Sequence, residues 1–207
     1  MGVLDQIAGA RGRNDGQLHI ELAEQLAGNG DAEGIADVVN GLGREQAVAG
    51  DCVKVLYEIG YRNPGLIAPY AETFLGLLQS KNNRLVWGAM IALSRIAELN
   101  PHPVYAQLNT VLAAYERGSV ITVDNAVSVL AALCKADAAY EKRILPLLIR
   151  HLQSCRAREI PQHLERMSVC LQKSNIEPVV DILRTRMGEL SKPQQARVGK
   201  ALKKMKA

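Results

Sequence analysis

The chain has 207 residues, of which 48% are hydrophobic but only 4% aromatic, and its formal net charge is +4. So few aromatic residues exclude a large aromatic core and predict thin layers packed through aliphatic side chains. The sequence starts without a basic leader followed by an apolar segment, and no apolar run approaches the roughly 18 residues of a membrane span. We therefore expect a cytoplasmic protein without a membrane partner.

The first part of the chain, 1–30, predicts an N-terminal arm and one capping helix. A short helix is expected at 3–8, followed by the polar, glycine-rich segment 9–16. Residues 17–27 carry leucines at a helical spacing and end at a Gly-Asn-Gly stop, so they form the capping helix.

From residue 31 onward, apolar residues recur every three to four positions, which is the helical period. Turn-forming Asn-Pro pairs at 63–64 and 100–101 separate consecutive units. Five helix pairs are expected, and we interpret them as one continuous domain over 31–207. The pairs span 31–60, 64–99, 102–136, 138–173 and 175–205. Their helices are expected at 31–42 and 44–60, 64–79 and 82–99, 102–117 and 120–136, 138–153 and 156–173, and 175–190 and 193–205.

The second helices of these pairs superimpose at a shift of 37 residues. Ala49, Val53, Leu56 and Gly60 share one spacing, which returns in the next three pairs as Val86, Met90, Leu93 and Ala97, then Val123, Val127, Leu130 and Cys134, then Ile160, Leu164, Met167 and Leu171. A repeat of this length indicates a stack of similar units, each burying its apolar face against its neighbours.

Helix pairs of 37 residues, with a second helix reading Val86-Trp-Gly-Ala-Met-Ile-Ala-Leu-Ser-Arg-Ile96 after a short polar turn at 80–83, resemble HEAT repeats of the HEAT/armadillo superfamily. The resemblance covers about 31–207 and implies an all-α, right-handed α-solenoid, or superhelix. One departure is that aliphatic residues such as Ala49 and Val86 occupy the position where such repeats often carry a laddering arginine. The resemblance identifies the architecture and no activity.

The resemblance also implies that second helices line a concave face. Projecting helix 82–99 at 100° per residue directs its only tryptophan and Ile91 away from the core. Tyrosine, tryptophan and arginine are typical of protein-binding surfaces. The alternative is ordinary packing of these rings between units. The expected concave binding face comprises Tyr57, Tyr61, Arg84, Trp87, Ile91, Arg95, Asp124 and Ser128.

Charge is uneven along the chain. Residues 1–137 carry ten Lys and Arg against fifteen Asp and Glu, whereas 138–207 carry fifteen against six. This basic half predicts either a patch for phosphates or acidic segments, or a solvated cap that keeps the end of the stack in solution. The candidate patch comprises Arg156, Arg158, Arg166, Lys200, Lys203 and Lys204.

No motif for catalysis stands out. The sequence has neither a glycine-rich phosphate loop after a strand nor a nucleophile elbow, and we expect no enzyme activity, cofactor or small-molecule substrate. A family of alkylpurine DNA glycosylases is built from HEAT-like repeats, and that resemblance implies a concave cleft with aromatic residues and an acidic group facing a positively charged wall. Trp87 and Asp124 are one repeat apart at the same helical position, so we expect them to be neighbours, with Arg158 a further repeat along. That family relies on more than one tryptophan, and this chain has one.

Four residues have the side-chain types of a zinc site: His151, Cys155, His163 and Cys170. Their spacing matches no zinc pattern, and His163 falls on the core face of its helix, where a hydrogen-bonded structural histidine is the commoner finding. The expectation is therefore no metal.

The sequence predicts a non-enzymatic scaffold that binds another protein, as an extended segment or a helix. The alternative is nucleic-acid binding through the basic half.

Overall fold

The computed structural model describes residues 2–13 and 16–206. These residues fold into helices and turns and contain no strand, which confirms the all-α class. They form two compact units, 1–126 and 127–207, and the boundary falls inside α9 (Val120–Ala136). Each unit is described by itself, so one continuous superhelix over 31–207 stays a prediction.

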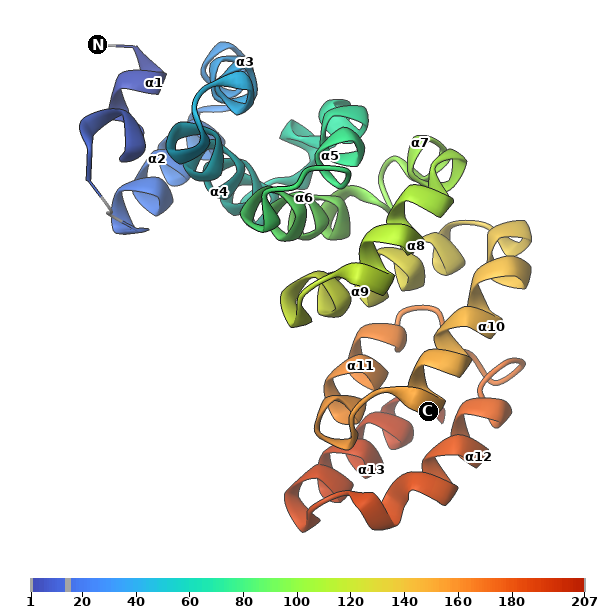
Figure 1. Cartoon of the computed structure of the whole chain (residues 1–207). Helices are drawn as coiled ribbons and strands as arrows, with labels where there is room; N and C mark the ends of the chain where they lie inside the picture. Colours follow the sequence, from blue (N-terminus) through green and yellow to red (C-terminus); the bar gives the residue numbers. More distant parts are fainter. Residues whose placement is uncertain (1, 14–15, 207) are drawn as a thin grey trace. The chain divides into compact units, whose positions relative to one another are not determined.

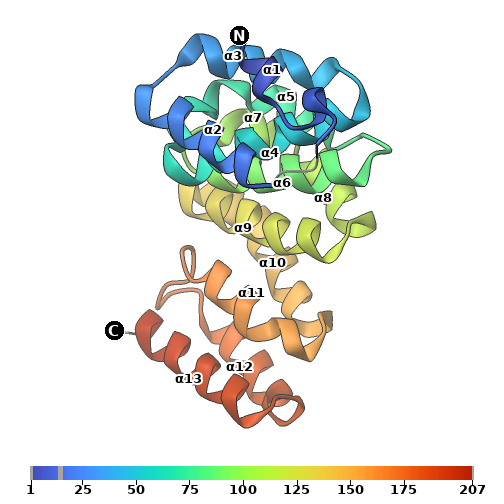
Figure 2. The ribbon, with the colours of Figure 1, turned by 90° about the vertical axis from the view of Figure 1, so that its left-hand side faces the viewer.

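Unit 1 has two layers of helices (Figures 1 and 2). In one layer α4 packs against both α2 and α6. This layer consists of α2 (Gly16–Asn29), α4 (Gln46–Arg62) and α6 (Asn83–Ile96). The expected capping helix is therefore present as α2, and it covers one side of α4.

The other layer of unit 1 holds α1 and the first helices of the pairs. Here α3 packs on α4, and α5 packs on α6 and α7. Its members are α1 (Val3–Gln6), α3 (Ala32–Asn40), α5 (Ala71–Leu77), α7 (Pro101–Ala106) and α8 (Leu108–Arg117).

Unit 2 repeats the two-layer plan. One layer pairs α10 (Ala138–Ser154) with α12 (Glu177–Arg186), and the other pairs α11 (Ile160–Met167) with α13 (Lys192–Lys206) (Figure 2). Short 3₁₀ turns replace parts of the expected α-helices. These are Gly41–Gly43, Pro64–Leu66, Ala68–Tyr70, Ala157–Glu159 and Met187–Glu189.

Two expected helices are shorter than predicted. The helix expected over 64–79 is α-helical only from Ala71, because Pro64 and Pro69 lack the N–H that an α-helix needs and each starts or sits in a 3₁₀ turn. The helix expected over 156–173 ends at Met167. There Ser168 Oγ donates to Glu165 O at 2.7 Å, a local bond that competes with the continuing helix.

The repeat correctly identifies the buried face. Of the sixteen ladder positions, all are buried except Val123, which is half-buried. Gly88 lets α6 approach α4 closely, since a Cβ at that position would lie 2.8 Å from Val53 Cγ1. Small and aliphatic side chains thus close the layers, as the low aromatic content predicts.

Polar side chains tie each helix pair to the next within a unit. These hydrogen bonds join residues 32 to 38 positions apart, which is the length of one repeat. In unit 1 they run from Lys54 to Gly16 O, Arg62 to Glu24 and Asn100 to Ala68 O, and in unit 2 from Arg166 to Ser128, Asn175 to Glu141 and Arg186 to Leu152 O.

No helix in the described part of the chain combines the length and the hydropathy that crossing a membrane requires.

Candidate functional site

Aromatic rings and an arginine from α4 and α6 lie against one another on unit 1. The Tyr57 ring meets Tyr61 edge-on and Trp87 at a tilt, with centroids 6.1 Å apart in each case. The Arg95 guanidinium lies 5.1 Å from the Tyr61 ring centroid, within cation–π range. We call Tyr57, Tyr61, Trp87 and Arg95 the aromatic strip.

Exposure varies along this strip. Tyr61 is 52% exposed, whereas Trp87 and Arg95 are half-buried. Tyr57 is only 8% exposed, and burial raises the pKa of its hydroxyl to about 12. Tyr57 therefore supports the rings around it, and Tyr61 presents the most accessible surface.

The expectation that Ile91 faces away from the core is wrong. Ile91 is 6% exposed, because the face of α6 that the helical projection left open is covered by neighbouring structure. A single helix projected at 100° per residue shows only the face toward its own pair, and it misses the contacts made with the preceding and following pairs.

Arg84, also expected on the concave face, is held by a buried carboxylate. It forms an ion pair with Asp51 of α4, which is 5% exposed. The other Asp51 oxygen lies 3.3 Å from Nε2 of His19, a residue of α2 that is 2% exposed. Burial lowers the pKa of His19, and Asp51 opposes that shift without reversing it. His19 and Asp51 were not among the predicted site residues, although a charged residue beside Cys52 in a buried helix was a signal.

The last two residues of the expected face lie on α9. Asp124 belongs to unit 1 and is half-buried, and Asn125 beside it receives a 3.4 Å contact from Ser94 of α6. Ser128 belongs to unit 2, where its hydroxyl accepts a 2.6 Å hydrogen bond from Arg166. A face that continues from the aromatic strip to Ser128 stays a prediction, as does the glycosylase-like arrangement of Trp87, Asp124 and Arg158.

Several arginines of the basic half are partnered by neighbouring groups. Arg156 pairs with Glu159, Arg166 with Ser128, and Arg186 with Glu189 at 2.7 Å. Arg197 makes a two-pronged contact with Glu165 that lowers the pKa of that carboxyl. Arg158, Lys200, Lys203 and Lys204 are exposed. These pairs leave the net charge of 138–207 positive, and exposed cations occur both on α13 and elsewhere, as at Lys142 and Arg158.

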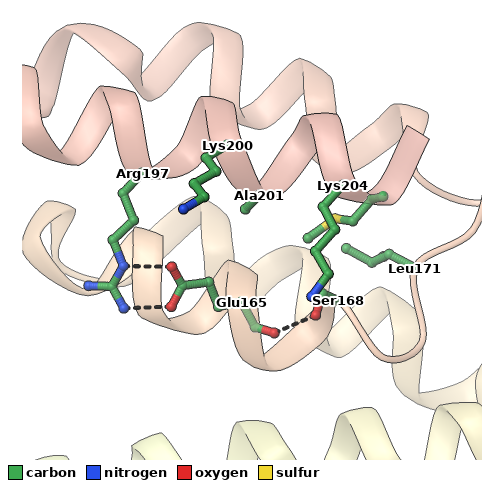
Figure 3. A pocket seen from close by; sticks show the side chains of 8 residues that line it. Glu165, Ser168, Leu171, Arg197, Lys200, Ala201 and Lys204 are labelled. Atoms are coloured by element: carbon green, nitrogen blue, oxygen red, sulfur yellow. Dashed lines mark hydrogen bonds and ion pairs between the residues drawn. The ribbon is translucent and has the colours of Figure 1, made fainter. Parts of the chain in front are cut away.

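A hollow of about 830 Å³ lies between α11 and α13 (Figure 3). Its polar wall carries the Arg197–Glu165 pair, and Lys200 and Lys204 extend from α13 beside it (Figure 3). The apolar wall comes from Leu171, Ala201 and Met205. The hollow combines positive charge with an apolar floor, which suits an amphipathic segment or an anion.

Three of the four zinc-type residues meet in unit 2. The ligand atoms of His151, Cys155 and His163 all lie within 4.8 Å of one another, and His151 Nε2 is 2.8 Å from His163 Nδ1. Burial raises the pKa of the Cys155 thiol, against the opposing effect of the Arg186 guanidinium. Cys170 is not part of this group. It pairs with Cys134, and their hydrogen bond, followed by burial, raises the pKa of Cys134.

No family model matches the chain, and no curated protein matches it. Solved structures do. An engineered protein from the Northeast Structural Genomics Consortium superimposes with a TM-score of 0.59 at 18% identity, covering 100% of this chain and 98% of its own. A second engineered protein from that consortium gives a TM-score of 0.64 at 18% identity over 99% of this chain and 58% of its own. At this identity the likeness concerns the fold alone.

Proposed function

We propose that this chain is a non-catalytic binding module that captures another protein through the aromatic strip of unit 1. The partner is a helical or extended segment that places an apolar side chain on Tyr61 and a carboxylate near Arg95. The observation that carries the proposal is Tyr61 itself, half exposed on a buried ring and flanked by a guanidinium.

Pre-organisation supports this assignment. Tyr61 rests on Tyr57, and Arg95 is positioned over Tyr61 while its Nε donates to Ser94 Oγ at 3.1 Å. Side chains that are already ordered lose little entropy on binding, and Tyr, Trp and Arg dominate binding hot spots. The strip therefore offers contact area at a low ordering cost.

The chemistry of the strip favours binding over catalysis. Its groups are three aromatic rings and a guanidinium, and the Tyr57 hydroxyl, with a pKa of about 12, stays protonated near neutral pH. Such groups stack and donate hydrogen bonds, but they do not accept a proton in that range.

A peptide-display selection on the immobilised full chain tests the proposal. Tyr61→Ala and Arg95→Gln should each lower the affinity of enriched peptides at least about tenfold, as hot-spot residues do. Leu99→Ala is the matched control, because Leu99 is 57% exposed in the same unit and lies outside the strip. Enriched peptides that bind all variants equally, or no enrichment at all, would exclude the strip.

A second candidate is nucleic-acid binding through α13. Its support is that Lys200, Lys203 and Lys204 are exposed on one helix and that two of them border the hollow beside α11. Lysines that face solvent make phosphate contacts that are independent of sequence. The salt dependence of DNA binding tests this candidate.

A further inference from the structure

We propose that His151, Cys155 and His163 form a binding site for a borderline-soft divalent ion of the Zn²⁺ type. The site lies entirely within unit 2, where the end of α10 meets α11. It shares no residue with the aromatic strip, so its test is independent of the proposed protein binding.

The backbone brings the three side chains together. His151 sits in the last turn of α10, and Cys155, the residue after that helix, donates its N–H to His151 O at 2.8 Å. His163 lies at the end of the first turn of α11. The sequence spacing is uninformative because the approach of the two helices, rather than a local loop, sets the distances.

The distances suit a tetrahedral ion. With Zn–N near 2.0–2.1 Å and Zn–S near 2.3 Å, tetrahedral geometry places two nitrogen ligands about 3.3 Å apart and nitrogen and sulfur about 3.6 Å apart. The ligand atoms here lie within 4.8 Å of one another, and the two histidine nitrogens are 2.8 Å apart. The histidine nitrogens would have to separate by about 0.5 Å, and the sulfur, which lies within 4.8 Å of them, would have to approach by up to about 1.2 Å; side-chain rotations supply both movements.

Burial and ligand type define the class of metal. His163 is 0% exposed, His151 7% and Cys155 9%, so the ligands are already removed from bulk water. Two imidazoles and a thiolate select zinc-like ions over Mg²⁺ and Ca²⁺, which prefer oxygen. Three protein ligands leave a fourth position for solvent, the arrangement of open zinc sites.

The Arg186 guanidinium offsets part of the effect of burial, which disfavours the Cys155 thiolate that the ion requires. Arg186 Nη1 lies 3.9 Å from Cys155 Sγ and donates to Leu152 O at 2.7 Å. Glu189 balances the Arg186 charge through a 2.7 Å contact, which limits its repulsion of a cation. An arginine held in this way stabilises a negative sulfur without competing for the metal.

Proton accounting gives a further signature. With both imidazoles neutral, one of them donates across the contact between His151 Nε2 and His163 Nδ1, and the Cys155 thiol carries a further proton. On binding, the histidine that donates across this contact shifts to its other tautomer, so that both facing nitrogens coordinate the ion. The thiol proton leaves to solvent. Binding should therefore release one proton per ion.

The test is Zn²⁺ titration of the reduced, chelator-treated full chain, with Co²⁺ as a spectroscopic substitute. We expect one saturable site per chain, a thiolate-to-Co²⁺ charge-transfer band, one proton released and a raised melting temperature with Zn²⁺. Cys155→Ser should weaken Zn²⁺ binding by more than about 100-fold, beyond the cost of losing an outer-shell partner, and should abolish the band. Cys170→Ser, a buried thiol of the same unit outside the group, should leave both unchanged.

His163→Gln should also weaken binding, and its circular dichroism shows whether the fully buried substitution is tolerated. If that variant unfolds, Cys155→Ser and the wild-type cobalt spectrum decide the question. Absence of a saturable site, a cobalt complex without the thiolate band, or wild-type affinity in Cys155→Ser would overturn the proposal and leave the histidines as a hydrogen-bonded structural pair.

Discussion

The Arg84 guanidinium of α6 pairs with the Asp51 carboxylate of α4, and so joins two helices that belong to successive repeats. Asp51 is 5% exposed, and its second oxygen lies near His19 of α2. One carboxylate thus connects three neighbouring helices of the layer that carries the aromatic strip.

Asp51→Asn should destabilise unit 1 by about 1–3 kcal/mol, because the change leaves buried polar groups with weakened partners. Urea unfolding followed by the fluorescence of Trp87, the only tryptophan, measures the effect on this unit. Asp37→Asn on the exposed surface of α3 is the control and should change stability by less than about 0.5 kcal/mol. Equal effects of the two variants would show that the Asp51 contacts contribute nothing.

The same cluster predicts a pH dependence. Burial lowers the pKa of His19 below its usual 6.5, and Lys54 and Arg84 add to the shift while Asp51 opposes it. The unfolded chain therefore binds more protons than the native chain at mildly acidic pH, so stability is complete above about 6.5 and is lost as pH falls below it.

Urea unfolding at pH 7.5 and 5.5, followed by tryptophan fluorescence, should show lower stability of unit 1 at the lower pH. His19→Gln should flatten this slope, because glutamine does not titrate. His102→Gln, which changes a histidine outside the cluster, should retain it. An unaltered slope in His19→Gln would assign the pH dependence to another group.

Trp87→Ala should cost unit 1 about 1–3 kcal/mol, since the half-buried indole packs on Tyr57. Tyr61→Ala should cost under about 1 kcal/mol, because about half of its surface is already in water. Thermal melts followed by circular dichroism compare the two, as the first variant lacks the fluorophore. If Trp87→Ala melts like the wild type, Trp87 belongs to the open surface, and it then becomes the better binding probe.

The 37-residue spacing predicted the helices and their buried faces because both depend on periodicity within one helix. Val53, Leu93 and Leu164 are all 0% exposed, as the repeat requires. Ile91 was misplaced because its burial depends on how one pair packs against the next. Periodicity carries no information about that packing.

In the candidate sites, too, some features follow from periodicity within one helix and others depend on how helices pack. Tyr57 and Tyr61 lie one turn apart on α4, and Trp87 lies on α6, which packs against α4, so their contacts follow from the pairing of successive second helices; their role as a binding face stays a prediction. His151 and His163 come from different helices of one pair, so their 2.8 Å approach depends on how α10 and α11 cross. The sequence supplied the ligand types without the geometry.

Cys52 should resist alkylation in the native chain. Burial raises the pKa of its thiol to about 12, and the side chain is 0% exposed. At pH 8 only about one thiol in 10⁴ is then ionised, compared with roughly one in four to one in ten for a free cysteine. Iodoacetamide labelling with peptide mass spectrometry should show slow modification at Cys52 in buffer and fast modification in denaturing urea. Similar rates in both would place Cys52 outside the core.

Nucleic-acid binding, the second candidate, should be weak and strongly salt-dependent. Arg156, Arg186 and Arg197 are paired with carboxylates, and this candidate assigns the phosphate contacts to Lys200, Lys203 and Lys204, which are exposed on one helix. Three such contacts predict a slope of about −2 to −3 for log affinity against log salt on mixed-sequence DNA.

The double variant Lys200→Gln/Lys204→Gln should reduce the steepness of that slope by about two, because each phosphate contact contributes about 0.9. Lys142→Gln, an exposed lysine on α10, is the matched control and should leave the slope unchanged. Fluorescence anisotropy of labelled DNA measures the affinity between about 50 and 200 mM salt, the range over which binding through a few phosphate contacts weakens. No binding at the lowest salt would remove this candidate. If the double variant does not alter the slope, any DNA binding does not involve α13 or the hollow beside α11.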